Sequence, residues 1–376
     1  MSLRYGAQHP PGLSRRWGRH RGIISLWITV LILWAVEALA ITVSLSSTPP
    51  PQTIRPDADI ARVMLAVQHD GQPLSHGRIQ VKVTAPPRPS LLSTDFPVVE
   101  ATTLLELASD LRDGTFSFDY LFPIRGAYTF DVALQPVAGS PQFAPTTIQT
   151  SWQLRENPAE IRNVWLLVLG LFILGGVFGL VLARSAQAKS ALLLTAMLVF
   201  TGLVMRAEGD VRGQAEASKT QQAVRGEHGW ALQVNSTPAQ GTVGQQVRFD
   251  MVLTKDGEVF AEATELSLEL HHIEDDKSIF KTNILAPKGE TSQQLQFFDG
   301  APHRVKITAH PAAGDPADPN HQPLQAVFDM EVNGIQPPLA VKLRTLALLI
   351  GVLIIGMAAG WFCPVGSKEA GGAPIC

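Results

Sequence analysis

Histidine is the residue type with the clearest potential for chemistry in this 376-residue chain. By the period-two alternation of a strand, His272 lies on the same face as Leu268 and Leu270, and His303 shares a face with the apolar residues that follow it. By the same alternation, Met330 faces inward on a later strand. If these strands pair, two imidazoles and a thioether converge, and such nitrogen and sulfur ligands suit copper. The alternative is a set of strand-end histidines whose ring nitrogens are satisfied by the backbone or by water.

Glu37 is the only acidic residue inside the long apolar runs of the chain. A carboxylate at membrane depth is a candidate for moving an ion or a proton. The ~15 residues between Arg21 and Glu37 correspond to roughly 22 Å of helix, which places Glu37 close to the outer interface, where its side chain reaches water. An interfacial carboxylate is therefore the favoured interpretation, and a small transporter that uses Glu37 is an alternative.

Two pairs of glycines have the four-residue spacing that allows membrane helices to pack closely. Gly175 and Gly179 fall in one apolar run, and Gly356 and Gly360 fall in the last. The spacing predicts helix contacts, either within the chain or with another subunit.

Motifs of the common enzyme classes do not occur in the sequence. There is no Gly-x-Ser-x-Gly, no His-Glu-x-x-His, no phosphate-binding loop and no dinucleotide fingerprint. The formal net charge is −3, and an acidic excess in the polar segments disfavours nucleic acid as a partner. The only cysteines, Cys363 and Cys376, lie near the C-terminal end. These observations indicate a non-catalytic protein, with no cofactor indicated apart from the copper considered above.

Four apolar runs organise the chain, and each approaches the length needed to cross ~30 Å of hydrocarbon as a helix. We therefore expect a membrane protein with four transmembrane α-helices and two all-β, immunoglobulin-like sandwich domains. The expected helices comprise residues 23–45, 163–184, 190–206 and 343–363, and the expected sandwiches comprise residues 46–161 and 207–341.

Arginine and lysine residues set the expected orientation. The tail 1–22 is rich in arginine, and the short link between the two central runs carries Arg184 and Lys189. We therefore expect both termini, including the tail 364–376, in the cytoplasm and both sandwiches outside. Because the outer segments contain no cysteine, a bacterial-type plasma membrane or a thylakoid membrane is favoured.

The first apolar run has a second interpretation. Its basic start, its apolar centre and the tripeptide Ala38-Leu39-Ala40 are features of a cleaved signal peptide. The length of the run, and Glu37 just before the cleavage position, favour a retained anchor.

Short stretches of alternating apolar and polar residues fill both polar segments and predict antiparallel β-sandwiches. The two segments also contain an internal repeat: Val63–Gly71 and Phe249–Gly257 both end in Asp-Gly, and a Gly-Ala turn precedes a later strand in each. The clearest strands are expected at 79–83, 116–122, 128–134 and 148–154 in the first segment, and at 247–253, 266–270, 305–309 and 324–332 in the second.

These features resemble the FixH and YtkA-like extracytoplasmic sandwich modules. The resemblance rests on an N-terminal anchor, a strand that ends in Asp70-Gly71, an alternating strand, and a late strand that begins Gly126-Ala127-Tyr128. It covers the sandwiches alone. The resemblance implies an accessory role in assembling haem-copper oxidases or in handling copper.

Taken together, the sequence predicts a non-catalytic integral membrane protein that presents two sandwiches for binding, scaffolding or assembly. Its expected partners are the lipid bilayer and a membrane-protein complex. Copper handling by His272, His303 and Met330 and a transporter based on Glu37 are the alternatives.

Overall fold

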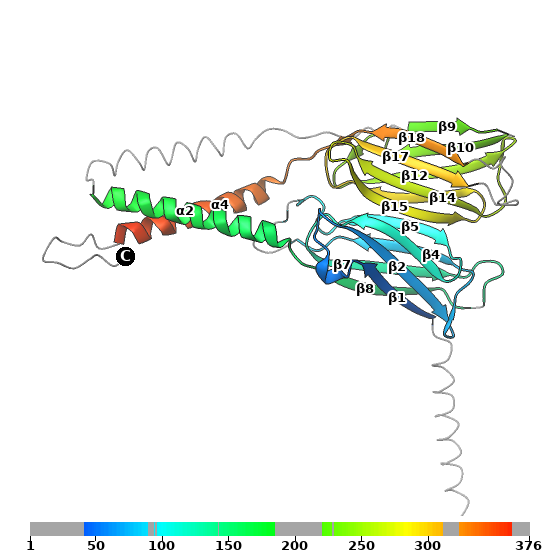
Figure 1. Cartoon of the computed structure of the whole chain (residues 1–376), viewed down its shortest axis with the longest axis horizontal. Helices are drawn as coiled ribbons and strands as arrows, with labels where there is room; N and C mark the ends of the chain where they lie inside the picture. The colour runs from blue at the N-terminus through cyan, green and yellow to red at the C-terminus, as the bar shows by residue number, and fades with distance from the viewer. Residues whose placement is uncertain are drawn as a thin grey trace, which may run out of the picture.

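The computed structural model describes residues 41–88, 94, 96–141, 143–184, 220–227, 229–310 and 323–362. Two large antiparallel sheets form two layers, and two long helices, α2 (Pro158–Arg184) and α4 (Leu339–Phe362), leave one end of this strand region (Figure 1). The structure is therefore mostly β, with the helices confined to one side.

Each sheet combines strands from both halves of the chain. From edge to edge, the first sheet contains β1 (Ile41–Thr48), β2 (Ile60–His69), β6 (Thr115–Leu121), β15 (Lys277–Ala286), β14 (Thr264–His272), β17 (His303–His310) and β18 (Leu324–Met330), with β3 (Gln72–Pro73) paired to β2. The second sheet contains β8 (Thr146–Leu154), β7 (Gly126–Gln135), β4 (Arg78–Thr84), β5 (Thr103–Asp110), β16 (Glu290–Gln296), β12 (Gln246–Lys255), β10 (Trp230–Thr237) and β9 (Thr220–Arg225), with β13 (Glu258–Val259) paired to β12. A parallel pair, β11 (Gly241–Thr242) and β19 (Val332–Asn333), and the 3-10 turn η2 (Pro51–Thr53) complete the elements.

Alternation of apolar and polar residues explains why these segments form strands. In β2, for example, Val63, Leu65 and Val67 are buried while the residues between them face outward. The buried faces of both sheets meet in a core cluster that contains residues from both halves of the chain. Burial of these side chains is the main favourable term in forming the two layers.

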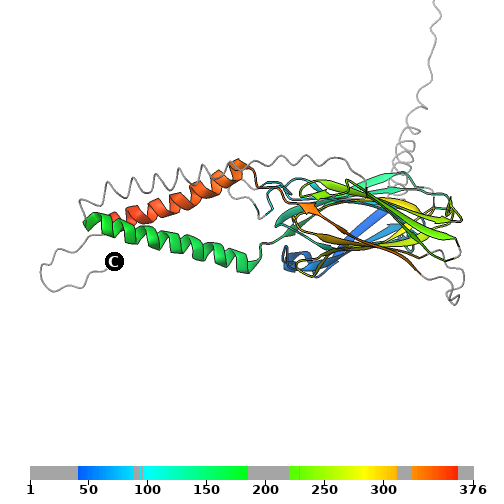
Figure 2. The same cartoon turned by 90° about the horizontal axis from the view of Figure 1, so that it is seen from above.

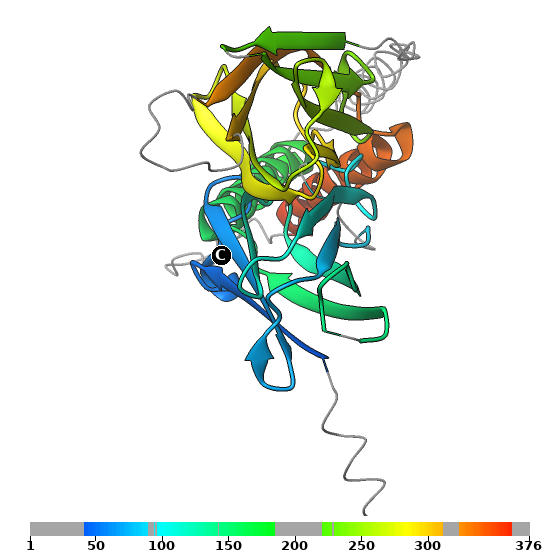
Figure 3. The ribbon, with the colours of Figure 1, turned by 90° about the vertical axis from the view of Figure 1, so that its right-hand side faces the viewer.

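The two halves of the chain repeat one strand order with the sheets exchanged. The group β1-β2-β6 of the first sheet corresponds to β10-β12-β16 of the second, and β8-β7-β4-β5 corresponds to β18-β17-β14-β15. The hairpins at Asp70-Gly71 and Asp256-Gly257 are equivalent, and both aspartates have a φ of 53°. The two halves thus repeat one arrangement of strands, in line with the internal repeat in the sequence, and they lie one above the other in Figure 3.

The seam between the halves is held by strand pairing and by side chains that extend it. Strand β6 pairs with β15, and β5 pairs with β16, over a few residues each. The buried side chain of Gln293 continues the second ladder: its Oε1 accepts from the N–H of Ala108 and its Nε2 donates to the carbonyl of Ala108, both at 2.8 Å. Ser109 Oγ accepts from the N–H of Leu285 at 2.9 Å. Because each half satisfies buried backbone groups of the other, the two halves form one body.

The two helices run in the same direction, converge with distance from the strand region, and pack through glycines (Figures 1 and 2). A Cβ atom on any of four glycines would overlap a backbone oxygen of the opposite helix, so only glycine allows this approach. The contacts are Gly175 with Leu353, Gly179 with Met357, Gly356 with Phe172, and Gly360 with Gly176. The structure therefore places the four predicted glycines at a contact within the chain.

The expectation of four transmembrane helices is wrong. Within the described ranges, α2 and α4 are the two helices long and apolar enough to cross a membrane. The end of the first expected span forms β1 instead, in which Ile41 pairs with His69 and Leu45 with Leu65. Its apolar residues alternate with Thr42 and Ser44, which suits a sheet edge. The tails 1–22 and 364–376, the remainder of the first expected span with Glu37, and the expected span 190–206 lie outside the described residues.

Both helices begin before the apolar run that predicted them. Helix α2 begins at Pro158 rather than at residue 163, because Asn157 caps it: Asn157 Oδ1 accepts from the N–H of Ala159 at 3.1 Å. Helix α4 begins at Leu339, directly after two prolines, rather than at residue 343. Hydropathy locates the apolar centre of such a helix, whereas capping residues locate its start.

Candidate functional site

A cluster of histidine and carboxylate side chains lies at the end of the strand region from which the helices leave. His272 ends β14, Asp275 lies in the turn to β15, and Asp299 lies in the connection from β16 to β17. His303 begins β17 at the same end, opposite Met330, the last residue of β18. Short connections from β8 and β19 lead from this end into α2 and α4.

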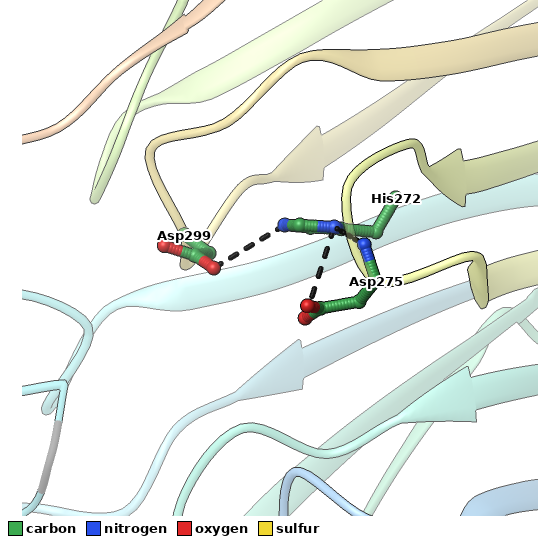
Figure 4. Close-up of side chains that lie close together, drawn as sticks. All are labelled: His272, Asp275 and Asp299. Atoms are coloured by element: carbon green, nitrogen blue, oxygen red, sulfur yellow. Dashed lines mark hydrogen bonds and ion pairs between the residues drawn. The ribbon is translucent and has the colours of Figure 1, made fainter.

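The ring of His272 is buried and faces one carboxylate on each side (Figure 4). Its Nδ1 accepts a hydrogen bond from the N–H of Asp275 at 3.0 Å, and Asp275 Oδ2 lies 3.8 Å from the same atom. Its Nε2 lies 3.3 Å from Asp299 Oδ2, but not in line for a hydrogen bond. The three residues offer ligand atoms that all lie within 4.8 Å of one another.

His303 lies directly opposite His272 but points elsewhere. Its Nδ1 donates to the carbonyl of Ala301 at 2.7 Å, which leaves the lone pair on Nε2. That atom has no partner among the described residues, and the ring lines a cavity of about 10 Å³ together with Tyr120, whose hydroxyl is likewise unpaired. Burial lowers the pKa of His303 to about 4, so the ring is neutral at neutral pH.

The predicted copper ligands are therefore brought into one row, but their ring nitrogens diverge. His272, His303 and Met330 occupy three adjacent strands in direct register, and all three are buried. The two imidazole rings meet edge to face, with centroids 5.0 Å apart. In the described structure, the group that converges on His272 consists of Asp275 and Asp299 and does not include His303.

Carboxylates dominate the electrostatics of this end. Burial raises the pKa of Asp57, Lys277 lowers it, and Asp299, Asp275 and Glu160 raise it further. Lys277 also donates a hydrogen bond to the carbonyl of Asp57 and so ties the first half to the second. Within the described residues, the basic side chain within 4.0 Å of both Asp275 and Asp299 is the imidazole of His272 rather than a lysine or arginine.

Sequence reasoning missed the two aspartates. The available signal was the acidic turn that follows His272 and the Asp299-Gly300 turn that precedes His303. Strand parity assigns faces to strand residues only, so it gave no direction for side chains in turns. Glu37, the other predicted site residue, lies outside the described residues.

Comparisons with known proteins give distant structural likenesses only. No protein-family model matches the chain, and no curated protein matches it. Trypsin-activated α2-macroglobulin from Escherichia coli is 8% identical with a TM-score of 0.23, over 79% of this chain and 16% of that chain. A DUF4785 family protein from Legionella pneumophila is 7% identical with a TM-score of 0.21, over 78% and 57%. A two-domain fibronectin type III segment of chicken tenascin is 8% identical with a TM-score of 0.15, over 78% and 98%.

These likenesses are distant ones between antiparallel β-sheet modules, and at such TM-scores they carry no argument. The chain spans about a sixth of the macroglobulin, since the match covers 16% of that chain. The resemblance to FixH and YtkA-like modules has no family match behind it.

Proposed function

We propose that the protein is a non-catalytic, membrane-anchored scaffold. Helices α2 and α4 insert side by side in the bilayer and hold the two-layered β-structure at its outer surface. There the sheets bind, or help to assemble, a membrane-protein complex. The observation that carries this proposal is that two apolar helices leave the same end of one rigid strand-built body.

The surfaces of the helices support insertion in lipid. Their apolar side chains are largely exposed, for example Trp165 at 67% and Ile355 at 63%, whereas a core helix of a globular protein buries such residues. The glycine contact leaves the outer faces of the pair for the acyl chains.

The seam supports a scaffolding role rather than two independently moving modules. The Gln293 contact joins the halves within the second sheet, and the Ser109 contact joins β5 of the second sheet to β15 of the first. A partner that contacts both halves therefore meets surfaces fixed relative to each other, which reduces the entropy lost on binding.

Protease treatment of sealed, right-side-out vesicles tests the anchoring. Added protease should degrade residues 41–154 and 220–333 and leave fragments that contain α2 and α4. Survival of the β-structure in intact vesicles, with degradation only after lysis, would contradict the outer placement. Mild-detergent purification with cross-linking tests the scaffolding role, and a chain that always purifies alone, from cells at native expression level, would contradict it.

Copper handling of the FixH or YtkA-like type is the second candidate function. It is favoured by the direct register of His272, His303 and Met330, which places two imidazoles and a thioether in one buried row. The divergence of the ring nitrogens weighs against it, because a shared ion needs both to turn inward. Copper titration of the full chain, wild type against His303→Ala and Met330→Leu, decides: equal affinities remove this candidate.

A further inference from the structure

The geometry points to a binding site for a divalent transition-metal ion of the zinc class, formed by His272 Nε2 and Asp299 with Asp275 as the carboxylate beside the ring. This inference goes beyond the scaffolding role and does not depend on it, because it concerns residues that neither anchor the protein nor join its halves.

The spacing of the atoms fits one shared ion better than a direct hydrogen bond. Two ligands of a tetrahedral zinc ion at about 2.0–2.1 Å are separated by about 3.3 Å, since the angle between them is near 109°. His272 Nε2 and Asp299 Oδ2 are 3.3 Å apart, and the contact is out of line for an N–H donor. The Nε2 atom is fully buried without a hydrogen-bond partner among the described residues, and it points toward Asp299 (Figure 4).

The surrounding charge also favours a cation. Asp275 and Asp299 have no lysine or arginine partner among the described residues, and they lie close enough to Asp57 to disfavour its ionisation. The equivalent turn of the first half is balanced differently: Arg125, which precedes Gly126 as Asp299 precedes Gly300, pairs with Glu156. A bound cation would supply at Asp299 the positive charge that the first half obtains from an arginine.

Binding requires a defined exchange of hydrogen bonds. Without an ion, Nδ1 accepts from the N–H of Asp275, so the ring proton is on Nε2. When an ion takes the lone pair of Nε2, the proton moves to Nδ1, and the Asp275 carboxylate, 3.8 Å away, becomes its acceptor. The imidazole stays neutral throughout, and the turn 273–276 adjusts. A ligating histidine whose second nitrogen donates to a carboxylate is the usual arrangement around zinc.

The donor set selects the class of ion. One imidazole and carboxylate oxygens suit zinc and its divalent neighbours, whereas monovalent copper prefers thiolate or thioether ligands. Water molecules would complete the coordination on the solvent side, since the carboxylate of Asp299 is 47% exposed.

Zinc titration of the full chain tests the site. The protein is purified in detergent with a tag that contains no histidine, stripped with a chelator, and titrated with Zn²⁺ by calorimetry. The matched variants are Asp299→Asn and Asp276→Asn, because Asp276 forms an exposed pair with His271 at 2.9 Å on the other face of the same strand end. We expect Asp299→Asn to weaken Zn²⁺ binding at least tenfold and Asp276→Asn to change it less than twofold.

A third variant, His272→Ala, should abolish the Zn²⁺ binding that Asp299→Asn weakens. If this buried substitution unfolds the chain, as circular dichroism would show, the exposed Asp299→Asn variant alone decides. Wild-type protein that shows no saturable Zn²⁺ binding, or an Asp299→Asn variant with wild-type affinity, would overturn the site. Neither result would bear on the scaffold, which protease protection and cross-linking test separately.

Discussion

The two halves of the chain share one strand order but complete their helix-proximal ends with different chemistry. His303 on β17 corresponds to Tyr128 on β7, since each follows a Gly-Ala turn on an equivalent strand. The hydroxyl of Tyr128 donates to the carbonyl of Ile124 at 2.6 Å and accepts from its N–H at 3.0 Å. Continuing the β4–β7 register by one residue places Ala85 opposite Tyr128, where the second half has His272 opposite His303.

Aromatic rings fill the end of the first half. Phe122 packs edge to face against Tyr120 and Tyr128, at centroid distances of 5.0 and 4.8 Å, and Phe130 stacks at a tilt against Trp152 at 4.7 Å. The same architecture is therefore completed in one half by apolar rings and in the other by imidazoles and carboxylates. The fold therefore does not require the polar set, and the proposed metal site gives that set a use.

Removing an aromatic ring from the first half should have the largest effect on stability. We expect Phe122→Ala to lower the free energy of unfolding by about 3–5 kcal/mol, because the ring is fully buried among other rings. Urea unfolding of the detergent-solubilised chain, followed by tryptophan fluorescence, measures this. The exposed Val259→Ala variant should change it by less than ~0.5 kcal/mol. A small loss for Phe122→Ala would mean that the first end is not a packing cluster.

A substitution at the seam between the halves should lower the free energy of unfolding nearly as much. Gln293→Leu leaves the N–H and the carbonyl of Ala108 without their partners, and the expected loss is about 2–4 kcal/mol. The same unfolding measurement serves, with Gln294→Leu as the control, because its side chain lies on the other face of β16. If the two variants are equally stable, the halves are held by packing alone.

Strand parity predicted the row of His272, His303 and Met330 because a buried strand face leaves little freedom in side-chain direction. Hydropathy over-predicted helix at residues 41–45, since an alternating edge strand with few charges has the same average as the end of a span. The exchange of sheets at the seam could not be predicted, because it depends on tertiary contacts of single residues such as Gln293. The carboxylates beside His272 lie in turns, where side-chain direction does not alternate from residue to residue as it does in a strand.

The neutral state of His303 predicts a pH dependence confined to the second half. Burial holds its folded-state pKa at about 4, below the usual 6.5, so the unfolded chain takes up a proton as the pH falls between these values. Stability from this group is therefore fully present above pH 6.5 and is lost toward pH 4, by up to about 3 kcal/mol. The difference between wild type and His303→Gln in urea unfolding at pH 7 and pH 4.5 isolates the effect. An equal pH dependence in both proteins would contradict it.

The smallest effect is expected at the tyrosine that faces His303 across the seam cavity. The hydroxyl of Tyr120 is buried and has no partner among the described residues, so Tyr120→Phe should change the free energy of unfolding by less than ~0.5 kcal/mol or raise it slightly. Its counterpart in the first half is the matched control: Tyr128→Phe removes a hydroxyl with two backbone hydrogen bonds and should cost about 1–2 kcal/mol. If the two variants lose equal stability, the Tyr120 hydroxyl is as well satisfied as that of Tyr128.

The cavity between Tyr120 and His303 has a volume of about 10 Å³, which is the lower limit for one water molecule. Such a water molecule would join the Tyr120 hydroxyl to the lone pair of His303 Nε2. The pair of variants therefore tells whether the seam end of the second half is dry, like the aromatic end of the first, or is completed by a polar bridge.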